Sequence, residues 1–109
     1  MKFSLVITNY NRFKSIAGAI QEVHDMFDEI VINDDASNKL YDGKNVHDVL
    51  TDWCQRYSNV KLFRNEKNVG AFHNKHIALE KATNDWCVLL DSDNFLPRNY
   101  VKLLKNTKL

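Results

Sequence analysis

The feature of this sequence that most constrains its fold is a repeated switch between strand-like and helix-like hydrophobic patterns. Four apolar or β-branched runs predict strands, over residues 2–8, 29–33, 60–64 and 85–91. Apolar residues that recur at intervals of three and four predict helices, over residues 13–27, 46–57 and 71–83 and from Pro97 toward Lys105. Alternation of this kind predicts an α/β fold, with a mainly parallel four-stranded sheet flanked by helices.

These elements carry expectations about burial. Nearly continuous apolar strands are typical of strands that helices cover on both faces. The third helix has Phe72, His76 and Leu79 on one face, and residues 34–45 are predicted to form a polar loop. Because ligands bind outside the carboxyl ends of parallel strands, any functional site is expected at that edge of the sheet.

Composition excludes several classes of protein. The 109 residues allow one domain with a modest core. Lys and Arg total 15 against 14 Asp and Glu, so no general attraction for nucleic acid is expected. No run of about 18 apolar residues is present, so no membrane span is expected.

Cys54 and Cys87 match no zinc or redox spacing. They are expected to be two buried thiols in a reducing compartment, which favours a cytoplasmic location.

Each predicted strand is followed by a polar segment, and the fourth carries the sharpest signal. The segments are Thr8–Arg12, Asn33–Ser37, Arg64–Gly70 and Asp91–Asn94. Asp91 and Asp93 can both reach one site through the turn, and carboxylates of this kind hold Mg²⁺ or Mn²⁺ together with substrate phosphates. Because a lone D-x-D is very common, turn and capping roles before Pro97 are the favoured explanation of the pair taken in isolation.

Other polar residues at the strand ends suit a nucleotide. Asp34 and Asp35 are acceptors for a uracil imide or a ribose hydroxyl, with an Asx-turn as the alternative. Tyr10 is able to stack on a base, or to be a partly buried aromatic at the turn. Lys75 is able to meet a phosphate, although a solvated lysine is the default.

The sequence lacks the residues that would complete a histidine metal site or a glycine-rich phosphate loop. His73 and His76 have a chelating spacing but no third ligand, so structural or solvated histidines are favoured. Neither a G-x-G-x-x-G after the first strand nor a P-loop is present, so no glycine loop cradles a diphosphate. If a diphosphate binds here, a metal held by the aspartates would have to neutralise its charge.

Taken together, these segments resemble the N-terminal, nucleotide-sugar-binding half of family 2 glycosyltransferases, which have the Rossmann-like GT-A fold. The resemblance is carried by four ordered motifs: Ser4–Arg12, Glu29–Ser37, Asn68–Gly70, and Asp91–Asn94 followed by Leu96-Pro97. Residues 1–109 would then be a single GT-A-like domain.

The resemblance implies a role for each matching residue. Thr8, Tyr10 and Asp35 would hold the nucleoside, and Lys75 would help with the nucleotide or its phosphates. Asp91 would lie near the ribose or sugar, and Asp93 would be the main ligand of Mn²⁺ or Mg²⁺. The implied reaction transfers a sugar, with inversion, from a nucleotide-diphospho-sugar to the hydroxyl of an unidentified acceptor. A UDP-sugar is the first candidate donor.

The sequence also departs from the family pattern. Members continue beyond the final helix into a portion that supplies the acceptor site and the catalytic base, so no catalytic residue is identified and the chain is expected to be either truncated or naturally minimal. Lys75 stands where an arginine is usual, and Ala36 replaces a glycine, so that turn is expected to avoid positive φ.

Two alternatives to an active transferase follow. One is a non-catalytic nucleotide-sugar-binding module or an inactive fragment, which shares the binding residues and lacks the base. The other is a receiver-like phosphoacceptor domain, which is disfavoured because Thr8-Asn9-Tyr10 stands where its acidic pair belongs. An exposed sheet edge predicts a homo-oligomer or poor solubility.

Overall fold

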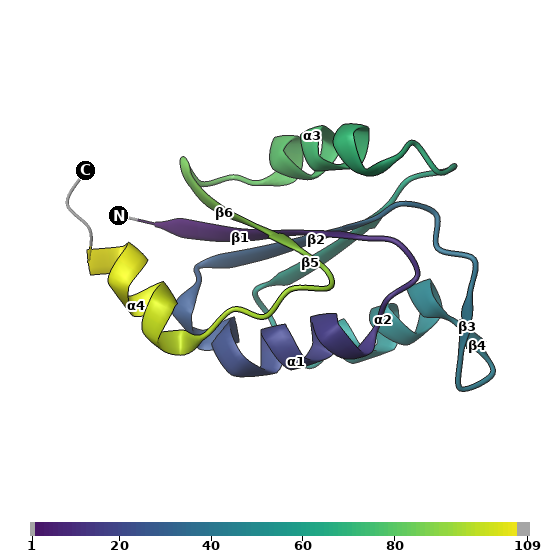
Figure 1. The fold of residues 1–109 in the computed structure, drawn as a ribbon, viewed down its shortest axis with the longest axis horizontal. Helices are drawn as coiled ribbons and strands as arrows, with labels where there is room; N and C mark the ends of the chain where they lie inside the picture. Colours follow the sequence, from purple (N-terminus) through teal and green to yellow (C-terminus); the bar gives the residue numbers. More distant parts are fainter. Residues whose placement is uncertain (1, 107–109) are drawn as a thin grey trace.

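The computed structural model describes residues 2–106 as one open, twisted sheet with helices on both faces (Figure 1). The elements in chain order are β1 (Phe3–Asn9), α1 (Lys14–Val23), a short 3₁₀ turn η1 (His24–Met26), β2 (Glu29–Asp34), β3 (Leu40–Tyr41), β4 (Lys44–Asn45), α2 (Val46–Cys54), β5 (Val60–Arg64), α3 (Ala71–Lys81), β6 (Trp86–Asp91) and α4 (Arg98–Asn106). All four predicted strands and all four predicted helices are therefore present.

The main sheet is entirely parallel and has the strand order β5-β2-β1-β6. At its centre Ile7 of β1 is in register with Ile32 of β2 on one side and with Leu90 of β6 on the other. This arrangement confirms the predicted α/β fold. It also brings the carboxyl ends of β1, β2 and β6 to one edge.

Burial differs between the central and the outer strands. Every residue of β1 and β2 is buried, as their continuous apolar pattern predicted. In β6, only Leu90 is buried, because this strand lies at the edge of the sheet. The expectation of two buried thiols is therefore right for Cys54 and wrong for Cys87, which is exposed on β6. Both cysteines are free thiols.

The two faces of the sheet are covered differently. Helices α1 and α2 cover one face and α3 covers the other (Figure 1). The apolar core lies on the α1 and α2 side, where residues such as Leu5, Ile20 and Leu50 are fully buried. On the other side α3 buries only Asn74 and Ala78.

The predicted apolar face of α3 exists but points away from the sheet. Phe72 and His76 lie side by side, with ring centroids 4.9 Å apart. Yet Phe72 is 71% exposed and Leu79 is 40% exposed. Helical spacing fixes which residues share a face, and here the buried face is the one that carries Asn74.

A short hairpin interrupts the predicted polar loop. Strands β3 and β4 pair antiparallel around Asp42 and Gly43, which both have positive φ, at 51° and 81°. An Asp-Gly pair of this kind favours a tight hairpin turn. Asn45 then begins α2 as its N-cap, because its side-chain oxygen accepts a hydrogen bond from His47 N at 2.8 Å.

The amino end of the sheet is held by Glu29, the first residue of β2. Its carboxylate, only 3% exposed, accepts hydrogen bonds from Ser4 Oγ at 2.8 Å, from Thr83 N at 2.8 Å and from Thr83 Oγ1 at 2.9 Å, and it pairs with Lys61. Burial alone would raise the pKa of Glu29, but these donors outweigh it and lower the pKa from 4.5 to about 2. Glu29 thus joins three strands to the segment before β6.

Among residues 2–106, no helix is both long and apolar enough to cross a membrane.

Candidate functional site

A cavity of about 440 Å³ opens where β1, β2 and β6 end, beside the first turn of α3. We call it the carboxyl-end cavity. Its lining residues are Thr8, Asn9, Tyr10, Arg12, Asp35, Asn68, Gly70, Ala71, Asn74, Lys75, Asp91, Ser92 and Asp93. Six of the seven residues proposed from the sequence therefore line one cavity; the exception is Asp34.

Asp34 lies on the other face of the sheet. Successive side chains of a strand alternate between faces, so Asp34 and Asp35 point in opposite directions. The Asp34 carboxylate is fully buried and accepts hydrogen bonds from Asn9 Nδ2 at 3.1 Å and from Ser37 N at 2.9 Å. It therefore fixes the turn that follows β2, in keeping with the turn role that the sequence left open.

Asp35 lines the carboxyl-end cavity and joins β2 to the start of α3. Its Oδ1 accepts hydrogen bonds from Val69 N at 2.8 Å and from Asn65 Nδ2 at 2.9 Å, and its Oδ2 accepts one from Gly70 N at 3.0 Å. A carboxylate offers about four acceptor directions. The described residues use three of them, so one direction on Oδ2 is left for a ligand.

The turn after Asp35 contradicts one expectation. Ala36 has a φ of 58°, although an alanine was expected to keep this turn out of positive φ. Neighbouring hydrogen bonds impose the conformation, because Asp35 N donates to Asn9 O at 2.8 Å and Ser37 N donates to Asp34. For a residue with a Cβ the left-handed region costs roughly 1–2 kcal/mol, so this turn is strained.

The turn after β1 presents Tyr10 at the mouth of the cavity. Asn9 and Arg12 are linked through the Asn9 side chain, and Asn11 N donates to Ser37 Oγ at 2.8 Å. Tyr10 is 44% exposed, whereas Thr8 at the end of β1 is buried. An accessible ring on a fixed turn is suited to stacking against a flat ligand.

The turn after β6 directs two carboxylates to the same cavity. Asn94 N donates to Asp91 O at 3.0 Å, and Ser15 Oγ donates to Ser92 O, which turns Ser92 inward. Asp91 and Asp93 both line the cavity, and both are exposed. Among residues 2–106, neither carboxylate accepts a capping hydrogen bond; Asp91 Oδ1 lies 3.4 Å from Lys75 Nζ.

These carboxylates fit a hard divalent cation that also binds a substrate. Within the described part of the chain, no group of three or more His, Cys, Asp and Glu side chains is placed to hold a metal. His73 and His76 are exposed on α3 and form no such group. Two carboxylates with free oxygens provide part of an octahedral shell, and phosphate oxygens are the usual remainder for Mg²⁺ or Mn²⁺.

Sequence reasoning missed several lining residues for physical reasons. Asn68 and Gly70 lie in the third of the four sequence motifs, but the sequence assigned neither of them a role. The sequence did not single out Asn74, because a lone asparagine in a helix indicates no function until the structure shows that its face of the helix lies on the sheet. Its i,i+4 spacing from Ala78 is the one clue that these two residues share a face.

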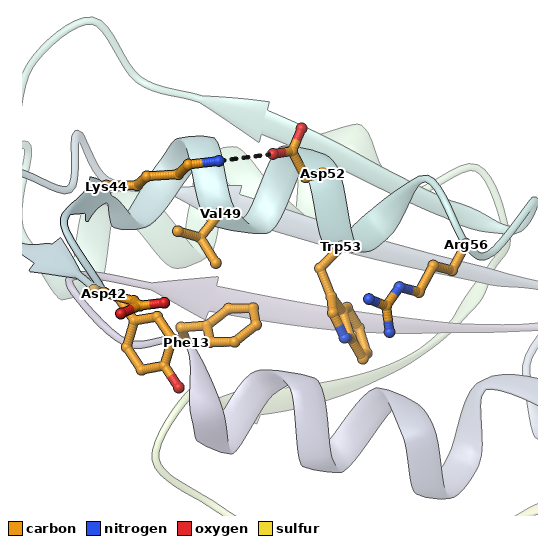
Figure 2. Close-up of a pocket in the computed structure, with 8 residues that line it drawn as sticks. Phe13, Asp42, Lys44, Val49, Asp52, Trp53 and Arg56 are labelled. Atoms are coloured by element: carbon orange, nitrogen blue, oxygen red, sulfur yellow. Dashed lines mark ion pairs between the residues drawn. The ribbon is translucent and has the colours of Figure 1, made fainter.

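A second cavity, of about 290 Å³, lies between α1, α2 and the hairpin (Figure 2). We call it the α1–α2 cavity. Its walls include the rings of Phe13, Tyr41 and Trp53, and its charged groups are largely occupied: Lys44 Nζ lies 4.0 Å from Asp52 Oδ2, and the Arg56 guanidinium lies over Trp53. None of the residues proposed from the sequence lines it. The convergent carboxylates and the exposed tyrosine favour the carboxyl-end cavity as the functional site.

Comparison with known proteins identifies relatives and similar folds. The chain is 26% identical over 106 residues to an uncharacterized glycosyltransferase of Rickettsia bellii, covering 94% of the chain and 14% of that protein. Its fold matches the UDP complex of S. aureus TarS residues 1–349, with a TM-score of 0.76 and 23% identity over 96% of this chain and 31% of that one.

A second solved structure has the same fold. It is the mannosyltransferase PcManGT from Pyrobaculum calidifontis in complex with GDP-Man and Mn²⁺, with a TM-score of 0.72 and 22% identity over 88% of this chain and 28% of that one. The chain thus spans less than a third of each of these proteins. The model of the glycosyl transferase family 2 matches residues 4–107, and the chain therefore belongs to that family.

Proposed function

We propose that the carboxyl-end cavity is the donor site of a metal-dependent, inverting glycosyltransferase that transfers a sugar from a nucleotide-diphospho-sugar to an acceptor hydroxyl. The observation that carries the proposal is the convergence of Tyr10, Asp35, Lys75, Asp91 and Asp93 on one cavity. These residues come from four segments far apart in the sequence. Together they offer an aromatic ring for the base, a hydrogen-bond acceptor for its imide, a cation for the phosphates and two carboxylates for a metal that bridges to them.

The nucleoside is held at the β1 and β2 side of the cavity. The Tyr10 ring stacks on the base, while Asp35 Oδ2 accepts from the imide N–H. A uracil base presents such an imide, so a UDP-sugar is the first candidate donor. The UDP bound to TarS and the GDP-Man bound to PcManGT support a nucleotide-sugar as the ligand class.

The diphosphate is held at the α3 and β6 side. Asp93, with Asp91 beside it, would bind Mn²⁺ or Mg²⁺, and the Lys75 ammonium faces the same phosphates. The metal, when bound, supplies Lewis-acid stabilisation of the leaving diphosphate. Lys75 adds positive charge where negative charge develops during transfer.

A non-catalytic donor-binding module is the second candidate, and one observation favours it. The carboxylates that line the cavity within residues 2–106 are Asp35, Asp91 and Asp93, and all three have binding roles. We therefore assign no catalytic base to these residues. Release of free sugar from a UDP-sugar by this chain, lost in Asp93→Asn, would eliminate the module.

Thermal unfolding with UDP, GDP, CDP and dTDP, each with and without Mn²⁺, tests the donor site. Ligand at about one hundred times its dissociation constant stabilises a fold by about 2.7 kcal/mol, which is several degrees for a domain of this size. We expect a Mn²⁺-dependent shift that Asp93→Asn abolishes. Asp42→Asn, which removes a carboxylate of the α1–α2 cavity, is the matched control and keeps the shift. No shift with any nucleotide overturns the proposal.

A further inference from the structure

Three asparagine side chains form a closed hydrogen-bonded triangle beneath the carboxyl-end cavity. Asn33 Nδ2 donates to Asn74 Oδ1 at 2.7 Å and to Asn65 Oδ1 at 3.0 Å, and Asn65 Nδ2 donates to Asn74 Oδ1 at 3.0 Å. Asn74 Nδ2 also donates to the backbone oxygen of Asn33 at 3.1 Å. The triangle therefore links β2, the segment after β5, and α3.

The triangle continues directly to the nucleoside side of the cavity. Asn65 Nδ2 donates to Asp35 Oδ1 at 2.9 Å as well. The other two donors to Asp35 are the backbone N–H groups of Val69 and Gly70, which immediately precede α3. The direction of the Asp35 carboxylate is thus set by Asn65 and by the position of α3, and Asn74 anchors both.

Stability alone does not account for three amides at this place. Asn33 and Asn74 are 1% and 2% exposed, and a buried amide is costly unless it is hydrogen-bonded. Among the described residues, Asn33 Oδ1 has no hydrogen-bond partner. Meanwhile Phe72 of α3 is exposed to solvent and Ala78 is the one apolar residue that this helix buries, so apolar packing between α3 and the sheet is small. Hydrogen bonds between buried polar groups rigidify the arrangement of the elements that they join.

We propose that Asn33, Asn65 and Asn74 are positioning residues that orient the Asp35 carboxylate toward the base edge and so favour uracil over cytosine. The uracil imide presents an N–H to the remaining acceptor direction of Asp35 Oδ2, whereas cytosine presents an unprotonated ring nitrogen there. A small rotation of Asp35 loses this distinction without removing the carboxylate. The inference rests on the proposed donor site.

The test compares two half-buried asparagines at opposite ends of β5. Asn65 follows the strand, and Asn59 precedes it, with its Nδ2 donating to His24 O at 2.9 Å and to Phe27 O at 3.0 Å. Binding of UDP and CDP with Mn²⁺ is measured by calorimetry for the wild type, Asn65→Ala and Asn59→Ala. We expect Asn65→Ala to lower the preference for UDP about fivefold, the effect of one ordinary hydrogen bond, and Asn59→Ala to leave it unchanged.

A second readout does not depend on nucleotide. Amide hydrogen exchange of Val69 and Gly70 is expected to accelerate in Asn65→Ala and to match the wild type in Asn59→Ala. If the wild type binds neither nucleotide, the donor site is wrong, and exchange alone decides whether Asn65 positions Asp35. An unchanged UDP preference in Asn65→Ala, or unchanged exchange at both amides, overturns the inference. If Asn65→Ala does not fold, Asn65→Ser is measured in the same way, with a smaller loss expected.

Discussion

Lys75 Nζ lies 3.4 Å from Asp91 Oδ1, so α3 and β6 are joined across the carboxyl-end cavity. The two side chains are 37% and 49% exposed, and a pair this accessible contributes at most about 1 kcal/mol to folding. Its importance lies in the cavity, where the ammonium partly neutralises a proposed metal ligand. A metal alone is therefore expected to bind weakly there, and more tightly once a diphosphate brings its own charge.

Replacing Lys75 tests its contact with phosphate. Lys75→Met is expected to weaken UDP binding about tenfold, because it removes a charge-assisted hydrogen bond, while Lys75→Arg keeps most of the affinity. The melting temperature without ligand should hardly change. Lys102→Met, on the exposed side of α4, is the control for loss of a surface charge. Calorimetry with UDP and Mn²⁺ gives the affinities, and wild-type affinity in Lys75→Met would remove Lys75 from the site.

Ala36 provides a test of backbone strain. With a φ of 58°, Ala36 is held in a region that glycine occupies without steric penalty. Ala36→Gly is therefore expected to raise the free energy of unfolding by about 1 kcal/mol, measured by urea denaturation. Ala17→Gly, inside α1, should lower it by a similar amount. A destabilising Ala36→Gly would show that the turn carries no strain.

Glu29 predicts how stability depends on pH. Its pKa is lowered from 4.5 to about 2 in the folded chain, so its contribution is fully present above pH 4.5 and is lost as the pH falls toward 2. The shift corresponds to about 3 kcal/mol at neutral pH. Urea denaturation of Glu29→Gln should show a loss of that order at pH 7 and a clearly smaller one at pH 3.

The matched control for Glu29→Gln is Glu80→Gln, which alters an exposed carboxyl group of α3. It should follow the wild type at both pH values. A Glu29→Gln variant whose stability differs from wild type by the same amount at pH 3 and pH 7 would contradict the assignment.

The two thiols are expected to react at very different rates. Cys87 is exposed, although partial desolvation of its thiol and the charges of Glu29 and Asp85 raise its pKa. Cys54, the last residue of α2, is buried, and burial raises its pKa to about 11. Titration with a disulfide reagent at pH 8 should modify one thiol in the folded chain and the second only on unfolding. Cys87→Ser should abolish the first phase; its persistence would contradict the exposure of β6.

The strands and helices were predictable because each is short, uninterrupted and bounded by polar turns. The predicted third strand coincides with β5, Val60–Arg64. Burial was predicted less well, because an apolar run does not reveal whether its strand lies in the centre or at the edge, and Cys87 was misjudged for that reason. The face of α3 that meets the sheet was equally hidden, since periodicity does not say which face is covered.

The candidate site was predictable where a motif sits at a strand end and unpredictable where a neighbouring segment decides the geometry. Asp91 is the last residue of β6 and Asp93 lies two residues beyond it, and both reach the cavity. The opposite directions of Asp34 and Asp35 depend on where β2 ends. The positive φ of Ala36 and the triangle around Asn74 depend in part on contacts between distant segments, from Asp35 N to Asn9 O and from Asn33 to Asn74.

The most direct test of the donor site uses the paramagnetism of Mn²⁺ in a backbone amide NMR spectrum. With UDP present, substoichiometric Mn²⁺ should broaden the amide signals of Ser92, Asp93 and Asn94 first, and UDP should shift those of Tyr10 and Gly70. Without UDP, the broadening should need much more Mn²⁺, and Asp93→Asn should remove it. Broadening centred on Asp42 and Asp52 of the α1–α2 cavity, or broadening that is indifferent to UDP, would contradict the account.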